Sequence, residues 1–181
     1  MYPIIRFLTT CIKAYLADTI TIDDISATSF RIRPWDIDMF LELNNGRVIT
    51  LYDLGRFDFS IRMGLAKALR QNKWGLVVAG STVRYRRRIR MFEKVTIYTQ
   101  VAGYEDRWIY IVQSMWAKGE PASSILLRTG ITNSGKVVPA RDVIDALGIE
   151  EWNPVLHPWV KEWIHSEESR LWPPPKDRLT L

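Results

Sequence analysis

The chain has 181 residues, 47% apolar and 12% aromatic, which is enough to bury the core of a single domain. It has one cysteine, Cys11, and two histidines, His157 and His165, late in the chain, so a Cys/His zinc site and a Ser-His-Asp triad both lack residues. The net charge of +5 suits an anionic partner, which could be a phosphorylated cofactor, a nucleic acid or a lipid surface.

An amphipathic helix is predicted within residues 1–19, because apolar residues there recur at helical spacing. It is too short and too charged for a membrane span of about 20 apolar residues. We favour a helix that covers the domain or a partner subunit, with an interfacial membrane helix as the alternative. We expect the protein to be cytoplasmic. The apolar residues of this helix are Ile4, Ile5, Leu8, Cys11, Ile12, Tyr15 and Leu16.

The loop at residues 35–46 concentrates polar chemistry. It follows a predicted strand, Ser29–Pro34, and precedes a predicted helix from Arg47 to about Gly64. The loop holds two Asp, one Glu, two Asn and one Gly, next to a helix start where backbone N–H groups lack internal partners. The helix has two nearly opposite apolar stripes, so we predict that it is packed on two sides and wrapped by a sheet. A short continuation is predicted at Ala66–Asn72.

From Gly75 the apolar residues follow a period of two, which predicts strands. The segments between them are typical of tight turns, so neighbouring strands should be antiparallel. The pattern indicates an α+β fold in which an antiparallel sheet curls around the long helix. The predicted strands are Leu76–Ile89, Val95–Val101, Trp108–Trp116 and Ser124–Thr132.

Two helices are predicted after the sheet, Ala140–Leu147 and His157–Ser169. The second carries tryptophans on one face, and these need a surface to cover. We therefore divide the chain into an N-terminal helix at 1–19, one main domain at 20–148 and a helical tail at 149–181.

The chain resembles the hotdog-fold thioesterases of the 4-hydroxybenzoyl-CoA thioesterase superfamily, and within it the thioesterase superfamily member 6-like branch. The resemblance extends from about Phe30 to Arg170 and includes the order of the elements. It rests on Pro34-Trp35-Asp36-Ile37-Asp38, Asn44-Asn45, Leu54-Gly55-Arg56, Tyr85-Arg86-Arg87-Arg88-Ile89-Arg90, Glu93 and the tail piece from Trp163 to Ser169.

This resemblance implies a homodimer whose sheets join edge to edge, often paired into a homotetramer, with active sites at the dimer interface. The substrate would be an acyl-CoA or a related thioester, with water as acceptor and no cofactor beyond the CoA of the substrate. No metal site is expected. The second acid of the Asp-x-Asp motif, here Asp38, is the catalytic carboxylate in one lineage. The family frequently has His where this chain has Glu42, which makes a non-catalytic acyl-CoA-binding or lipid-binding protein the alternative function.

Thioester hydrolysis needs a base or nucleophile and a site for the negative charge on the carbonyl oxygen. Asp38 could supply the first, and the backbone N–H groups of Asn45, Gly46 or Arg47 at the helix start could supply the second. Asn44 could orient the water or the loop. Glu42 could be a second base, an acceptor for a neighbour or a solvated residue. The structural alternatives are that Asp36 and Asp38 close a turn and that Asn44 or Asn45 caps the helix.

Arginines dominate residues 84–90, and we interpret them as binding the phosphates of CoA. A nucleic-acid partner is not expected, because no nucleic-acid motif accompanies them and alternation along a strand would divide them between two faces. A solvated basic strand is the alternative. The predicted substrate-binding residues are Arg87, Arg88 and Arg90.

Two further acids, Asp53 and Asp58, lie on the long helix, where another hotdog lineage keeps its catalytic acid. Their spacing from Arg56 and Arg62 is that of helical ion pairs, and we favour that role.

Overall fold

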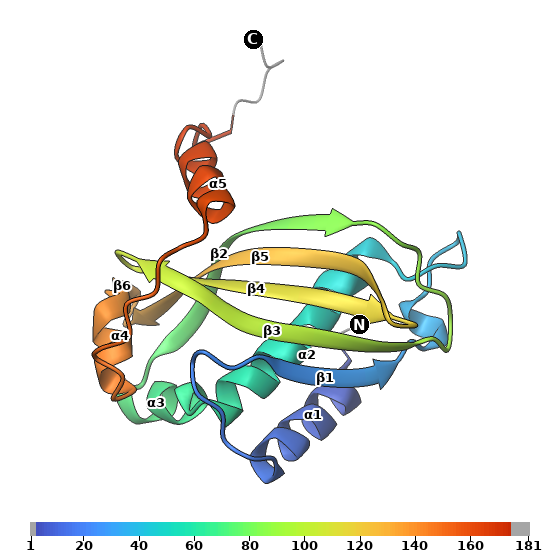
Figure 1. Cartoon of the computed structure of the whole chain (residues 1–181), viewed down its shortest axis with the longest axis horizontal. Coiled ribbons are helices and arrows are strands. Elements are labelled where there is room, and N and C mark those ends of the chain that lie inside the picture. Colours follow the sequence, from blue (N-terminus) through green and yellow to red (C-terminus); the bar gives the residue numbers. More distant parts are fainter. Residues whose placement is uncertain (1–2, 175–181) are drawn as a thin grey trace.

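The structure, a computed structural model that describes residues 3–174, is a curled antiparallel sheet with a long helix against its concave face (Figure 1). The parts of the predicted terminal ranges at residues 1–2 and 175–181 lie outside the described residues. In chain order the elements are α1 (Ile4–Leu16), β1 (Ser26–Arg31), a 3-10 turn η1 (Pro34–Asp36), α2 (Asn45–Arg62), α3 (Leu65–Asn72), β2 (Gly75–Tyr85), β3 (Lys94–Glu105), β4 (Trp108–Ala117), β5 (Glu120–Asn133), β6 (Lys136–Val138), α4 (Ala140–Ala146) and α5 (Pro158–Glu168).

The strands lie in the order β1-β3-β4-β5-β2, and the short β6 pairs with β5. All pairs are antiparallel. Strands β1 and β2 therefore form the two edges of the sheet. On β2 the apolar residues Leu76, Val77 and Val78 remain exposed along this edge.

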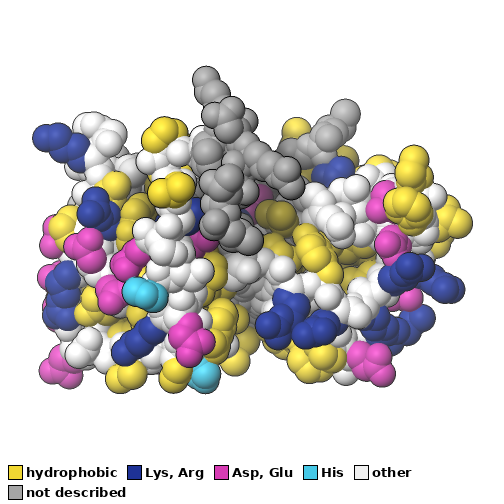
Figure 2. Space-filling model, turned by 90° about the horizontal axis from the view of Figure 1, so that it is seen from above, with side chains coloured by type: hydrophobic (Ala, Val, Ile, Leu, Met, Phe, Trp, Pro, Cys, Tyr) yellow, Lys and Arg dark blue, Asp and Glu magenta, His cyan; other side chains and the backbone are white. Residues whose placement is uncertain are grey.

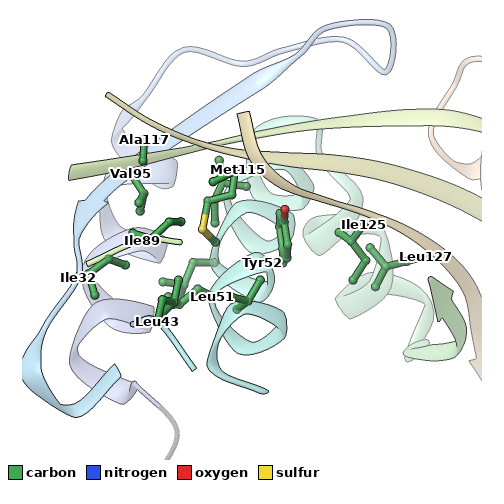
Figure 3. Close-up of a cluster of buried hydrophobic side chains, with 14 of the residues drawn as sticks. Ile32, Leu43, Leu51, Tyr52, Ile89, Val95, Met115, Ala117, Ile125 and Leu127 are labelled. Carbon is green, nitrogen blue, oxygen red and sulfur yellow. The ribbon is translucent and has the colours of Figure 1, made fainter. Parts of the chain in front are cut away.

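Helix α2 is packed on two sides, as its two stripes predict. One side is buried against the sheet, and Figure 3 shows Leu51 and Tyr52 among side chains that include Met115. On the other side α1 packs, with the rings of Phe7 and Phe57 edge to face at 4.7 Å between centroids. Gly55 lets the helix approach the sheet closely, since a Cβ there would lie within 3 Å of three side-chain atoms. The fold is thus the predicted α+β arrangement.

Several predicted boundaries shift by a few residues. The first strand is Ser26–Arg31 and not Ser29–Pro34, because its pairing with β3 begins at Ser26. Strand β2 ends at Tyr85, four residues before the predicted end. There the backbone N–H groups of Arg86 and Arg87 both donate to Ala122 O, which interrupts the ladder.

Helix α1 lies within the predicted range and packs on the domain, but with a face other than its main apolar one. It contacts α2 through Phe7, Thr10 and Ala14, which include the smallest residues of the helix. The apolar side chains predicted to cover the domain or a partner subunit are exposed in the single chain, apart from the half-buried Cys11: Ile4, Ile5, Leu8, Ile12, Tyr15 and Leu16. Among the described residues no helix combines the length and apolar character needed to cross a bilayer.

Helix α5 covers one end of the outer, convex face of the sheet, as Figure 1 shows. Val160 and Ile164 are buried there against Tyr110 and Leu126. Trp163 is half-buried in the same cluster. The tail thus covers an apolar surface that the strands alone would leave in water.

Candidate active site

The loop between β1 and α2 is anchored by Asp36, whose side chain is fully buried. Its Oδ2 accepts hydrogen bonds from the Arg6 guanidinium at 2.6 Å and from the backbone N–H of Arg33 at 2.9 Å. Its Oδ1 lies 3.3 Å from Nε of Arg47. The first acid of the Asp-x-Asp motif therefore joins α1, η1 and the first turn of α2, and it has a structural role.

The second acid, Asp38, begins a tight turn that ends at Glu42. The backbone N–H of Asp38 donates to Glu42 O at 2.9 Å, and its Oδ1 accepts from the N–H of Phe40 at 2.9 Å. The half-buried Asp38 side chain thus closes its own turn, which is the structural alternative for this residue. Its second carboxylate oxygen takes no part in that bond.

The start of α2 is capped by Asn44, whose Oδ1 accepts from the backbone N–H of Arg47 at 3.1 Å. Because the cap uses Arg47, the N–H groups of Asn45 and Gly46 remain at the positive end of the helix, where helix geometry gives them no internal acceptor. Asn44 therefore has the predicted capping role. Asn45 and Gly46 are placed to offer donors to an anionic group.

A cleft of about 230 Å³ lies where this loop, the helix start and the segment after β2 meet. Backbone hydrogen bonds hold the three parts together: Leu43 N–H donates to Ile89 O at 2.8 Å, and Asn44 N–H donates to Asp36 O at 2.9 Å. The lining residues are Glu42, Leu43, Asn45, Val48, Tyr85, Arg86, Arg87, Arg88, Ile89 and Ser123.

Four of the predicted site residues share this cleft: Glu42, Asn45, Arg87 and Arg88. The other four predicted residues do not line the cleft. Asn44, Gly46 and Arg90 are next in sequence to lining residues. Asp38 is joined to the lining residue Glu42 by a backbone hydrogen bond.

The arginines of the cleft have different surroundings. Arg87 is half-buried and donates to Ala117 O at 2.7 Å, with Glu120 at 3.2 Å. Arg88 is largely exposed, and its Nε lies 3.0 Å from Oε2 of Glu42. The predicted division of the arginines between two sheet faces fails beyond Tyr85, because the strand has ended and residues 86–88 all border one cleft.

Two hydroxyl-bearing residues of the cleft, Tyr85 and Ser123, were not among the predicted site residues. The hydroxyl of Tyr85 donates to Asn45 O at 3.3 Å, and burial raises the pKa of this phenol. Ser123 lies at the cleft wall with its Oγ 2.9 Å from the Tyr52 hydroxyl, whose pKa is also raised by burial. Tyr85 could have been found, since it lies within the basic run and shares the alternation of Arg87. Ser123 carries no comparable sequence signal.

The acids of α2 make the expected ion pairs. Asp53 is bonded to Arg56, and Asp58 lies 3.6 Å from Arg62. Asp58 is buried, and this burial raises the pKa of its carboxyl group.

A second cleft, of about 340 Å³, lies on the outer face of the sheet beside Tyr98 and Trp116. Its lining contains no acid, base or thiol, so it has no groups for hydrolysis. Within residues 3–174 no cluster of three or more His, Cys, Asp or Glu could hold a metal ion.

Known proteins match both the sequence and the fold. Protein THEM6 of Xenopus laevis is 33% identical over 97 residues, which are 53% of this chain and 47% of that protein. The chain thus matches about half the length of this curated relative. A DHNA-CoA thioesterase from Staphylococcus aureus superposes with a TM-score of 0.62 at 18% identity, covering 81% of this chain and 96% of that one.

A hypothetical protein of Staphylococcus aureus solved in complex with CoA superposes with a TM-score of 0.63 at 11% identity, covering 77% of this chain and 92% of that one. These structural likenesses identify the hotdog fold. The model of the thioesterase-like superfamily matches residues 32–164, from the end of β1 through most of α5. The chain therefore belongs to the thioesterase-like superfamily.

Proposed function

We propose that this protein hydrolyses acyl-CoA thioesters in the cleft between Glu42 and the arginines of residues 86–88. The observation that carries the proposal is that one cleft joins a carboxylate, the open start of a helix and three arginines. A thioester of CoA needs these three features, because it has a carbonyl to polarise, a water to activate and phosphates to neutralise. Membership of the thioesterase-like superfamily supports the same reaction class.

In this mechanism a carboxylate of the 38–42 turn takes a proton from water as the water oxygen attacks the carbonyl carbon. The carbonyl oxygen gains negative charge beside the N–H groups of Asn45 and Gly46. The carbon–sulfur bond then breaks, and CoA leaves as a thiol after taking a proton. We assign the base to Glu42, since it lines the cleft, and keep Asp38 as the second candidate on the same turn.

The exposed arginines, Arg86, Arg88 and Arg90, are proposed to bind the phosphates of CoA. They follow β2 directly, and two of them border the cleft. Arg87 is already paired with Ala117 O and Glu120, so it is better suited to holding the segment in place.

The active unit is proposed to be a homodimer that forms across β2. This strand is an edge of the sheet and has three adjacent exposed aliphatic residues, Leu76, Val77 and Val78. An exposed apolar edge is a ready surface for pairing with a second strand. The cleft begins at Tyr85, the last residue of β2, which brings each cleft close to the partner subunit in such a dimer.

The test is hydrolysis of short-chain to long-chain acyl-CoAs by the wild type and by Glu42→Gln and Asp38→Asn. Loss of a general base lowers the rate by about 10²–10⁴-fold. We expect this loss for Glu42→Gln, with Glu150→Gln, at an exposed acid elsewhere, as the matched control. Undiminished turnover of both turn variants would remove the carboxylates from the mechanism.

A non-catalytic acyl-CoA-binding protein is the second candidate. It is favoured by one observation: each turn carboxylate already has a partner, Phe40 N–H for Asp38 and Arg88 for Glu42. Acyl-CoA binding by calorimetry with no release of CoA thiol by the wild type would support this second candidate.

A further inference from the structure

Two neighbouring turns end in large apolar side chains that point into water. At the tip of the 38–42 turn, Met39, Phe40 and Leu41 are 86%, 72% and 75% exposed. In the turn before β3, Met91 and Phe92 are also exposed. Scattered single apolar residues are normal on a surface, but consecutive ones at the tips of two turns form a patch that needs a partner.

The backbone makes two of these residues unfavourable choices for the fold. Leu41 and Phe92 have φ values of 60° and 65°, in the left-handed region that favours Gly and Asn. A residue with a Cβ costs about 1–2 kcal/mol in that conformation. Because both side chains are exposed, core packing does not offset this cost. The reason for large apolar residues here therefore lies outside the isolated chain.

The two tips lie at the same end of the molecule. Phe92 N–H donates to Ile32 O at 3.0 Å at the end of β1, and Leu43 N–H donates to Ile89 O at 2.8 Å. The loop of residues 35–45 and the turn before β3 are both at the right-hand end of Figure 1. Figure 2 shows hydrophobic and basic side chains at that end, with acidic side chains among them.

The second of the two tip segments is strongly positive, whereas the first, residues 36–42, holds three acids. Residues 84–94 contain six Lys or Arg and one acid, so this segment alone holds a net charge of +5, the same as the whole chain. Of the basic residues, all but Arg87 are exposed. Each Lys or Arg held near an anionic membrane contributes about 1 kcal/mol of attraction.

We propose that this end of the molecule, with the tips at 39–41 and 91–92, docks on an anionic membrane surface. The apolar tips insert at the boundary between headgroups and acyl chains, and the net positive charge of residues 84–94 attracts the anionic headgroups. A nucleic acid could use the charge and stack bases on Phe40 and Phe92, but it would leave the exposed Met39, Leu41 and Met91 without a partner. A second copy of this chain would bring the same positive charge against itself.

The docked orientation places the cleft at the membrane, because Glu42 and Arg86–Arg88 belong to the same two segments as the tips. This step rests on the proposed function. A long-chain acyl-CoA partitions into bilayers with its acyl chain buried and its charged headgroup at the surface. The substrate class that fits is therefore a membrane-partitioned, long-chain acyl-CoA.

The experiment is co-sedimentation of the full chain with vesicles of phosphatidylcholine, alone or mixed with phosphatidylserine. We expect binding that requires phosphatidylserine and weakens as salt is raised. Leu41→Asn/Phe92→Asn should lower the partition coefficient about tenfold or more, since two apolar side chains no longer insert. The same variant should unfold at the same or a higher denaturant concentration, because Asn suits the left-handed backbone.

The matched control is Ser134→Asn, which introduces Asn at another left-handed position, φ 49°, in the β5–β6 turn. A second control is Val155→Ser, which removes an exposed apolar side chain near α5. Both should bind vesicles like the wild type. The proposal would be overturned if the wild type bound vesicles equally well with and without phosphatidylserine, or if the Leu41→Asn/Phe92→Asn variant bound as tightly as the wild type.

Two further outcomes also decide between explanations. If Leu41→Asn/Phe92→Asn instead turns a dimer into a monomer in light scattering, the tips are a subunit interface and the membrane proposal is wrong. Hydrolysis of a soluble short-chain acyl-CoA without vesicles tests the proposed function separately. If the wild type binds vesicles but releases no CoA, the docking proposal stands and the proposed hydrolysis is wrong.

Discussion

Replacing Asp36 by Asn tests whether the first acid of the motif holds the loop in place. The carboxylate is fully buried, and it faces two guanidinium groups whose side chains are only 15% and 14% exposed, those of Arg6 and Arg47. Removing one member of a buried ion pair costs about 3–5 kcal/mol. Since both arginines retain some contact with water, we expect the lower end, about 3 kcal/mol.

For a chain of this size, 1 kcal/mol shifts Tm by about 2–4 °C, so Asp36→Asn should lower Tm by about 6–12 °C. Urea unfolding gives the free energy directly, provided that the m-value is unchanged. The control is Asp38→Asn, where Asn can still accept the Phe40 N–H bond, with an expected cost of about 1 kcal/mol or less. A loss for Asp36→Asn no larger than this control would refute the structural role.

The partner change Arg6→Gln adds a second measurement. If the ion pair is responsible, combining Arg6→Gln with Asp36→Asn should cost less than the sum of the two single changes, with a coupling of about 0.5–3 kcal/mol. Additive losses would show that Asp36 acts through other contacts.

Three further predictions follow from the core, the buried acid and the edge strand. Gly55→Ala gains about 1 kcal/mol of helix propensity, but its Cβ would lie 2.7 Å from Oγ1 of Thr99, so we expect a net loss of about 1–2 kcal/mol in urea unfolding. A stabilised variant would contradict this packing. Burial raises the pKa of Asp58, so the protonated form stabilises the fold below about pH 4 and this stabilisation is lost as pH rises through the raised pKa. Asp58→Asn should remove this decline of the unfolding free energy with rising pH. If wild type and variant gave parallel curves of unfolding free energy against pH, the decline would not come from Asp58. Val77→Lys should convert the proposed dimer to monomer in light scattering, and an unchanged mass would exclude β2 as the interface.

The sequence predicts the fold well where the periodicity is strong. The two stripes of α2 require packing on two sides, and the sheet and α1 supply it. The predicted end of β2 was wrong. Arg86 and Arg87 continue the alternation in the sequence, but their N–H groups both donate to Ala122 O, which ends the strand pairing. Helix α1 packs on the domain, but not with the apolar face that its pattern marks. An amphipathic pattern indicates which face is apolar, but small residues such as Thr10 and Ala14 allow the closest helix contact.

The site is predicted only in part for a related reason. Asn44 and its cap follow from local chemistry, and the structure places Oδ1 of Asn44 on the Arg47 N–H. The different roles of Asp36 and Asp38 depend on a partner 30 residues away, Arg6, which no local pattern reveals. Ser123 reaches the cleft through the pairing of distant strands, so its place also depends on the complete sheet.

Helix α5 has a consequence for how larger assemblies can be built. Two sheets that stack face to face lie about 10 Å apart, with side chains filling the gap. A helix with its side chains is about as thick as that gap, and α5 already occupies it over one end of the outer face. Flush stacking of two such sheets over that end is therefore sterically blocked, and any stacking of these faces would have to use the part that α5 leaves uncovered.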